Sequence, residues 1–302
     1  MSAFDKINTG ISDSFEVSST NSSISKGLGL LFLLILVAIG VVGYLWDSEP
    51  EQFDVIALTA AETQKVDVRV VRGSTTVAVT IGIADQLLHK RGGYLTNDIS
   101  PPGIWMDNVP NWEFGVLVQV RDMARTLRNN MSRSQSQSIE DIGLVTAENQ
   151  FYFDSDSWML PASEDEYRRG ILALEDYLAR LGAQDQPSAQ FYARADNLQT
   201  WLSEVGTRLG SLSQRLSASV GKRQLNTALA GDSAATQSTS TQPETEMKTP
   251  WSELDDVFYE ARGTTWALLH LLRAVEIDFK DVLEKKNAVI SLRQIIRELE
   301  PT

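Results

Sequence analysis

Cysteine is absent from the 302-residue sequence, which excludes disulfide bonds, thiolate metal sites and cysteine nucleophiles. Basic residues are also scarce, because 27 lysines and arginines are set against 40 aspartates and glutamates, for a formal net charge of −13. A protein that binds nucleic acid needs a basic face to neutralise phosphates. We therefore expect no nucleic acid among the partners of this chain.

The sequence also lacks recognisable motifs of catalysis or metal binding. Its two histidines, His89 and His270, have no orienting partner that we recognise at helical spacing, so we interpret them as a last-turn residue and a packed residue. Residues 154–156 begin like a calcium loop, but Trp158 occupies a ligand position and Met159 stands where glycine is required. No G-x-S-x-G or H-E-x-x-H motif occurs. We expect no cofactor, no metal and no catalytic residue.

One long apolar run stands out from this polar background. Residues 27–46 read GLGLLFLLILVAIGVVGYLW without a charge, and about 20 helical residues are needed to cross a bilayer core. Tyr44 and Trp46 end the run, where aromatic residues favour the headgroup level. The main alternative is a cleavable signal peptide, but a polar leader precedes the run, the run is long, and no A-x-A site follows. We predict a retained transmembrane helix, Gly27 to Trp46, whose partner is the lipid bilayer.

The charges on the two sides of this run differ. Lys6, Lys26 and the amino terminus precede it, whereas Asp47, Glu49, Glu51 and Asp54 follow it before the first basic residue, Lys65. The positive-inside preference therefore predicts a cytoplasmic N-terminus and a periplasmic C-terminal domain, in a single-pass protein of the bacterial inner membrane. Within the run no glycine or alanine lies four residues from another, so close dimerisation through the membrane is not predicted.

Composition divides the rest of the chain. Residues 1–26 are rich in Ser, Thr and Asn and predict a disordered cytoplasmic leader, and residues 47–225 predict a helical periplasmic domain. Residues 226–248 are polar and predict a disordered linker. Residues 249–302 predict one long C-terminal helix or a helical hairpin that packs on the same domain, since no Gly or Pro interrupts residues 264–300.

Helical periodicity dominates this soluble part. It predicts helices over 75–90, ended by Gly92 and Gly93, and over 112–131. Residues 51–71 are ambiguous, because they combine a helical pattern over 55–65 with a β-branched alternation over 66–70 that fits a short strand. Ser163 and Glu166 have the spacing of a capping box at a helix start. The helix that follows carries one apolar stripe, made by Tyr167, Ile171, Leu174, Leu178 and Leu181. The next helix carries a heptad-like, coiled-coil seam that includes Leu198, Leu202, Val205, Leu209, Leu212 and Leu216. The predicted fold class is mainly α, with one N-terminal transmembrane helix and an elongated helical bundle.

Two segments combine aromatic residues with helix-breaking ones, so we expect two ordered loops rich in aromatics. Residues 94–111 contain Pro101, Pro102, Gly103 and Pro110 and so cannot be regular, and a second patch covers residues 151–161. Such loops either line a pocket or cap the end of a bundle. The candidate binding surface comprises Tyr94, Asn97, Asp98, Trp105, Asp107, Trp112 and Trp158.

Three arginines extend this candidate surface. Arg121, Arg125 and Arg128 are spaced four and three apart and therefore lie on one face of a helix. They either bind an anionic headgroup, a cell-wall carboxylate or an acidic partner, or they pair internally with the surplus of acidic residues.

The passage from Arg91 to Gly115, RGGYLTNDISPPGIWMDNVPNWEFG, continues into VRDMARTLRNNMSRSQS. It resembles domain of unknown function 2333, an uncharacterised family of proteobacterial inner-membrane proteins, and the resemblance extends from the apolar run to the last helix. It implies a Gram-negative envelope setting and brings no catalytic residues.

Together these patterns favour a membrane-anchored periplasmic interaction or scaffold protein of the bacterial envelope that is not an enzyme. Its expected partner is an envelope protein, or a second copy through the helical domain. The alternative is an envelope enzyme that acts on cell wall or lipid through acids and aromatics of residues 94–113 and 151–161. A sensor is a third hypothesis, weakened because we find no second span and no cytoplasmic output domain in the sequence.

Overall fold

The computed structural model describes residues 18–134, 139–183, 188–225 and 244–301, and the chain forms two compact units, residues 1–46 and 47–302. The described part of the first unit is α1 (Ser18–Trp46). Within α1, Lys26–Trp46 has a mean hydropathy of 2.8 and is, over the described residues, the one helix long and apolar enough to cross a membrane. α1 is compatible with a single-pass membrane anchor or a signal sequence.

α1 begins inside the segment for which composition predicts disorder. Residues 1–17 of that leader lie outside the described residues, but Ser18 to Lys26 are helical. Because a helix that has already nucleated grows one residue at a time without a new nucleation cost, the apolar run extends its helix into this polar flank.

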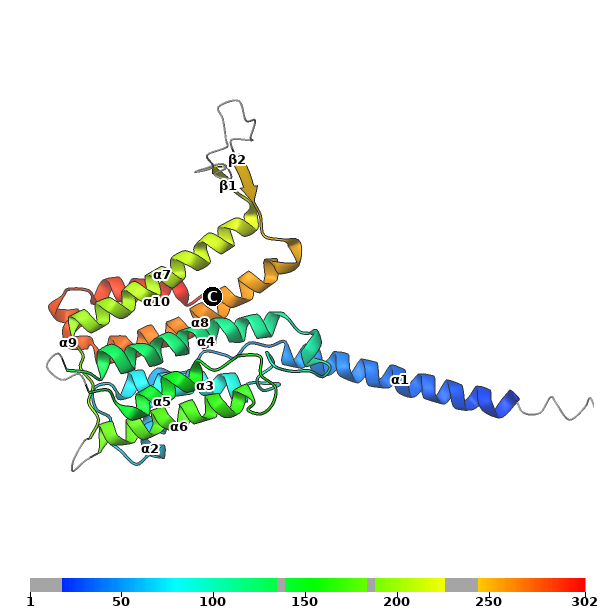
Figure 1. Ribbon diagram of the computed structural model, residues 1–302, viewed down its shortest axis with the longest axis horizontal. Helices are drawn as coiled ribbons and strands as arrows, with labels where there is room; N and C mark the ends of the chain where they lie inside the picture. Colours follow the sequence, from blue (N-terminus) through cyan, green and yellow to red (C-terminus); the bar gives the residue numbers. More distant parts are fainter. Residues whose placement is uncertain (1–17, 135–138, 184–187, 226–243, 302) are drawn as a thin grey trace, which may run out of the picture. The chain divides into compact units, whose positions relative to one another are not determined.

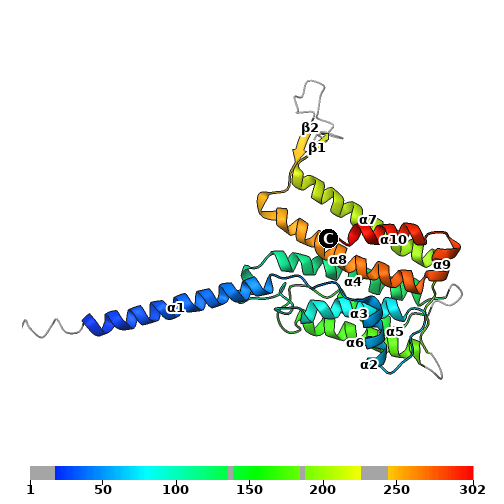
Figure 2. The same ribbon diagram turned by 180° about the vertical axis from the view of Figure 1, so that it is seen from behind.

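The second unit is a helical bundle, shown from two sides in Figures 1 and 2. α3 (Ser74–His89), α4 (Asn108–Thr126) and α8 (Leu254–Asp278) form its middle, covered on one side by α2 (Val55–Lys65), α5 (Ile142–Phe151) and α6 (Ser163–Gly182). α7 (Ala195–Val220) and α10 (Val289–Leu299) cover the other side. The remaining elements are η1 (Gly103–Trp105), η2 (Leu127–Met131), η3 (Trp251–Glu253), α9 (Lys280–Lys285), β1 (Lys222–Leu225) and β2 (Glu244–Met247). The predicted mainly α class is confirmed.

The core follows from the apolar stripes of these helices. All five residues of the stripe on α6, from Tyr167 to Leu181, are buried. α3 is buried on nearly every side, as its place between α6 and α8 requires. Gly92 and Gly93 have φ of 87° and 74°, so the predicted left-handed residues do follow this helix.

α4 and α8 approach each other more closely than side chains would allow. A Cβ atom on Gly263 would lie 2.0 Å from the carbonyl oxygen of Trp112, and one on Gly115 would lie 2.2 Å from that of Glu260. Only glycine at both positions lets the two backbones pack at this distance.

Three local predictions are corrected. The capping box is wrong, because Ala162 is the N-cap of α6 and the Ser163 hydroxyl donates to the carbonyls of Asp154 and Ser157 at 2.7 and 3.0 Å. Pro110 lies in the first turn of α4, where a missing amide hydrogen breaks no helical bond. Residues 66–70 form a turn and an irregular segment and pair with no strand.

The C-terminal segment is a hairpin. The chain leaves helical geometry at Phe279 and Asn287, and α10 returns along α8, held by Arg293 and Glu276 at 2.6 Å and by Arg273 and Glu300 at 3.0 Å. Of the predicted linker 226–248, residues 226–243 lie outside the described residues. Glu244–Met247 pairs antiparallel with Lys222–Leu225, since backbone pairing does not require apolar side chains.

Candidate functional site

The two aromatic loops lie side by side at one end of the bundle. We call residues 94–107 the first loop and residues 152–162 the second loop. The Tyr94 hydroxyl donates to the Ser155 carbonyl at 2.9 Å, and the Asn97 amide donates to the Ser157 carbonyl at 2.8 Å and to a Glu164 carboxylate oxygen at 2.6 Å. Side chains of the first loop therefore fix the backbone of the second.

A buried ion pair fixes the first loop to the bundle. Lys90 Nζ lies 2.6 Å from Glu113 Oε1, with side-chain exposures of 1% and 0%. The same carboxylate accepts the amide hydrogens of Leu95 and Thr96, both at 2.9 Å, and the Thr96 hydroxyl. Burial raises the pKa of Glu113, while Lys90 and these donors act against that rise. Glu113 belongs to the enzyme hypothesis, but its carboxylate is enclosed and fully engaged.

The structure divides the candidate residues of the loops into two groups. Tyr94, Asn97 and Trp112 are buried, and Trp112 packs against Trp266 at a ring distance of 5.2 Å. Trp105 and Trp158 are instead 66% and 50% exposed. The buried members of the predicted surface therefore have aromatic neighbours or loop carbonyls as partners within the protein, and Trp105 and Trp158 are its exposed tryptophans.

The two aspartates of the first loop have different surroundings. Asp107 caps α4 by accepting the Asn108 amide hydrogen at 2.9 Å. Asp98 is half-buried, and burial together with the nearby Glu164 charge raises the pKa of its carboxyl. For Asp107 the sequence does contain a signal of this role, because an Asp directly before a helix start is a recognisable cap.

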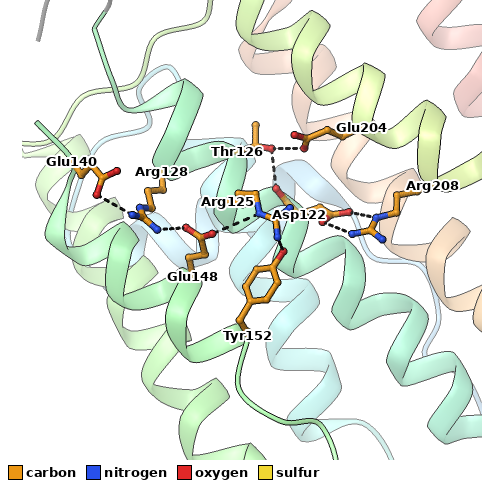
Figure 3. A network of polar contacts seen from close by, with 9 residues as sticks. All are labelled: Asp122, Arg125, Thr126, Arg128, Glu140, Glu148, Tyr152, Glu204 and Arg208. Carbon is orange, nitrogen blue, oxygen red and sulfur yellow. Dashed lines mark hydrogen bonds and ion pairs between the residues drawn. The ribbon is translucent and has the colours of Figure 1, made fainter. Parts of the chain in front are cut away.

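The three arginines face partners within the protein, and Figure 3 shows those of Arg125 and Arg128. Arg121 donates to the carbonyls of Phe151 and Phe153 at 2.7 and 2.8 Å. Arg128 bridges Glu148 at 2.8 Å and Glu140 at 2.9 Å. Arg121 and Arg128 therefore pair internally, as the second of the two alternatives expects. Their hydrogen bonds attach α5 and the segments next to it to α4 and η2.

Arg125 and its neighbours continue this network towards α7 (Figure 3). Arg125 donates to the Tyr152 hydroxyl and lies 3.6 Å from Glu148. Also on α4, the Asp122 carboxylate accepts two hydrogen bonds from the Arg208 guanidinium group, at 2.8 and 3.0 Å. Such paired hydrogen bonds give geometric specificity as well as energy. The network joins α4, α5 and α7. No local pattern in the sequence predicts the contact of Asp122 with Arg208, because the two residues lie far apart along the chain.

Both histidines have structural partners. His89 Nδ1 lies 2.8 Å from Asp85, one helical turn earlier, so the interpretation that it lacks a partner at helical spacing is wrong. His270 is fully buried, and its Nε2 accepts the Phe53 amide hydrogen at 3.1 Å while Nδ1 lies 2.7 Å from the Trp266 carbonyl. The Phe53 ring stacks on the imidazole at 3.9 Å. These contacts require a neutral ring and hold residues 47–54 against α8.

His270 should make stability depend on acidity. Burial lowers its pKa from the ordinary 6.5 to about 4, so between these values the unfolded chain binds a proton that the folded chain does not. Stability is complete above pH 6.5 and falls towards pH 4, by about 3 kcal/mol in total. Urea unfolding in mild detergent should show this loss in the wild type and a smaller loss in His270→Gln. Equal losses in the two proteins would contradict the assignment.

A second buried polar group, Asp278, caps a distant helix. The N-cap of α3 is Gly73, which has no side chain for capping, and Asp278 accepts the amide hydrogens of Gly73 at 2.9 Å and Thr76 at 2.7 Å. Burial raises the pKa of this carboxyl. The signal in the sequence for this group is an acidic residue between Ile277 and Phe279 in an apolar stretch.

α7 leaves much of its apolar seam uncovered. Leu198, Val205 and Leu212 are buried, whereas the alternate positions are only half-buried. A groove of about 360 Å³ follows the C-terminal half of α7 beside α8, and its apolar lining includes Leu209, Leu212, Leu216, Val220 and Ala261. A second groove, of about 520 Å³, lies where α7 meets α9. The predicted seam thus has a partner helix along only part of its width.

Comparison with known proteins places the chain in a family. Residues 19–302 match a family model described as an uncharacterized protein conserved in bacteria, DUF2333. No curated protein and no solved structure matches the chain. Over the residues that the structure describes, no group of three His, Cys, Asp or Glu residues could hold a metal ion. Because the match covers nearly the whole chain, from residue 19 to residue 302, the chain belongs to the bacterial family DUF2333, as the loop sequence predicts.

Proposed function

We propose that this protein is a membrane-anchored interaction protein of the bacterial envelope, with α1 retained in the inner membrane and the bundle in the periplasm. The apolar span and its acidic C-terminal flank support this topology. The observation that carries the function is the open groove between α7 and α8. Grooves of this kind receive the apolar face of an amphipathic helix.

The groove suits a helix from a different protein. Its lining is apolar along Leu209, Leu212 and Leu216. The neighbouring Arg215 and Glu260, each adjacent in sequence to a lining residue, pair with each other at 2.6 Å, so their charges are already compensated. A symmetric dimer needs a surface that is complementary to itself. A concave groove is complementary to a ridge, so we assign it to a partner helix.

Photo-crosslinking in cells tests this function. A photoreactive residue at Leu216 or Thr265, both in the groove, should capture one discrete partner. The same residue at Leu172, an exposed position on α6 with 56% exposure, serves as the matched control. Adding Leu209→Asp should abolish capture from Thr265, since a carboxylate in the groove opposes an apolar helix face.

The outcomes are distinct. A partner captured from the groove, absent at Leu172 and lost with Leu209→Asp would support the proposal. An adduct with the mass of two copies would instead identify self-association. Equal capture at all three positions, or capture that survives Leu209→Asp, would contradict the groove as the binding surface.

A further inference from the structure

Apolar side chains project from the tips of both loops. On the first loop, Trp105 is 66% exposed. On the second loop, Leu160 is 92% exposed, and Trp158 and Met159 are 50% and 49% exposed. Ile99 and Ile104 of the first loop are exposed as well. Exposed apolar side chains gathered on two adjoining loops are typical of a contact with another apolar phase.

These tips are held in place rather than left free to collapse. The Ser157 hydroxyl donates to the Pro161 carbonyl at 2.8 Å, and the Ser163 amide donates to the Ser157 carbonyl at 2.9 Å. Both bonds close the base of the segment that carries Trp158, Met159 and Leu160. Leu160 has a φ of 60°, a backbone region that an L-residue enters at a cost. The second loop therefore presents its apolar residues in a fixed arrangement.

The loops lie at the end of the bundle where the chain enters it. Asp47, the first residue of the bundle unit, is near enough to Asp107 that this charge contributes to raising its pKa, after burial. Asp107 closes the first loop and caps α4. Asp47 is bonded to Trp46, the last residue of the apolar span. If α1 is an anchor, covalent continuity keeps this end of the bundle close to the bilayer and gives lipid a high effective concentration there.

The charge of the two loops favours one kind of lipid surface, an uncharged one, over an anionic one. The two loops contain Asp98, Asp107, Asp154 and Asp156 and no lysine or arginine. Their contact with a membrane would therefore be apolar and interfacial, and anionic headgroups would oppose it.

We propose that the first and second loops rest on the bilayer in which the same chain is anchored, with Trp105, Trp158 and Leu160 at the level of the headgroups. Tryptophan is enriched at this level because its ring is apolar and its N–H is polar. The inference rests on the proposed function only in requiring that α1 is retained as an anchor. It assigns the exposed loop tryptophans to lipid, while the α7–α8 groove stays free for a partner.

Fluorescent labelling of the full chain tests the contact, because the absence of cysteine makes each introduced cysteine unique. Single cysteines replace Ile104, Met159, Ile290 and Leu36, and the labelled proteins are reconstituted in phosphatidylcholine vesicles with nitroxide-bearing lipid. Ile290, on α10 and 80% exposed, is the matched apolar control. Labels at Ile104 and Met159 should be quenched at least about twofold more than the label at Ile290, since quenching requires lipid contact.

Leu36, within the apolar span, reports on the anchor separately. Quenching at Leu36, Ile104 and Met159 but not at Ile290, reduced when phosphatidylglycerol replaces part of the phosphatidylcholine at low salt, is the expected result. Quenching at Leu36 with loop labels as unquenched as Ile290 would overturn the loop contact alone. No quenching at Leu36 would overturn the anchor, and with it both proposals. Trp105→Ser with Leu160→Ser should lower quenching at Met159 while leaving Leu36 unchanged.

Discussion

Gly263→Ala is expected to lower the free energy of unfolding by about 3 kcal/mol or more, although alanine is the better helix former. The added methyl group would lie 2.0 Å from the Trp112 carbonyl oxygen, and this neighbour is backbone that no rotamer change can move. α4 and α8 would have to separate, which would loosen the packing around the Trp112 and Trp266 rings. Gly115→Ala should have a similar effect for the same reason, against the carbonyl of Glu260.

The matched controls are Gly206→Ala and Gly210→Ala on α7, where an added Cβ meets no neighbouring heavy atom within 4 Å. These should stabilise the protein by up to about 1 kcal/mol, because helical alanine restricts the unfolded chain. Urea unfolding followed by far-ultraviolet circular dichroism compares all four variants with the wild type. If Gly263→Ala were as stable as Gly206→Ala, the close approach of α4 and α8 would be refuted.

The sequence predicts those parts of the fold that depend on local periodicity. The stripe from Tyr167 to Leu181 identifies the buried face of α6 because residues three and four apart share a face whatever packs on them. Gly92 and Gly93 mark the end of α3 for an equally local reason, their freedom to adopt positive φ. Neither prediction needs knowledge of the partner helix.

Features that depend on distant residues escaped prediction. Gly115 and Gly263 each lower the helix propensity of their own helix. Only the close approach of α4 and α8 at these two positions explains why glycine is needed there. Asp278 caps α3 from the end of α8, so the capping residue is far from the helix start where a local search looks. The failed capping box at Ser163 has the same origin, since carbonyls of the second loop take its hydroxyl.

The sequence indicates two ordered aromatic loops but does not separate their exposed side chains from their buried ones. Proline and glycine with aromatics indicate an ordered loop, yet nothing in composition separates buried Trp112 from exposed Trp105. That difference arises because Trp112 lies on the face of α4 that meets Trp266 of α8. The arginine spacing likewise predicted a common face, whereas the acids opposite it, Glu140 and Glu148, come from α5 and the segment before it.

Removing one member of the Lys90–Glu113 pair is expected to lower the free energy of unfolding as strongly as Gly263→Ala does. Lys90→Met should lower the free energy of unfolding by about 3 to 5 kcal/mol, because it leaves a buried carboxylate without its counter-charge. Glu113→Gln should lower it comparably, since the Lys90 ammonium, only 1% exposed, loses its partner. Both changes should also release the first loop, whose Leu95 and Thr96 amides depend on the same carboxylate. Protease cleavage between residues 94 and 107 would report that release.

The double variant separates pairing from simple loss of packing. Lys90→Met with Glu113→Gln removes both charges together, so its destabilisation should be smaller than the sum of the two single effects by more than about 1 kcal/mol. The exposed pair Arg168 and Asp165, with side-chain exposures of 52% and 61%, provides the control, and Arg168→Met should cost less than about 1 kcal/mol. Strict additivity at Lys90 and Glu113 would contradict a buried ion pair and would free Glu113 for the enzyme hypothesis. Strong coupling would instead assign Glu113 to holding the loop that presents Trp105.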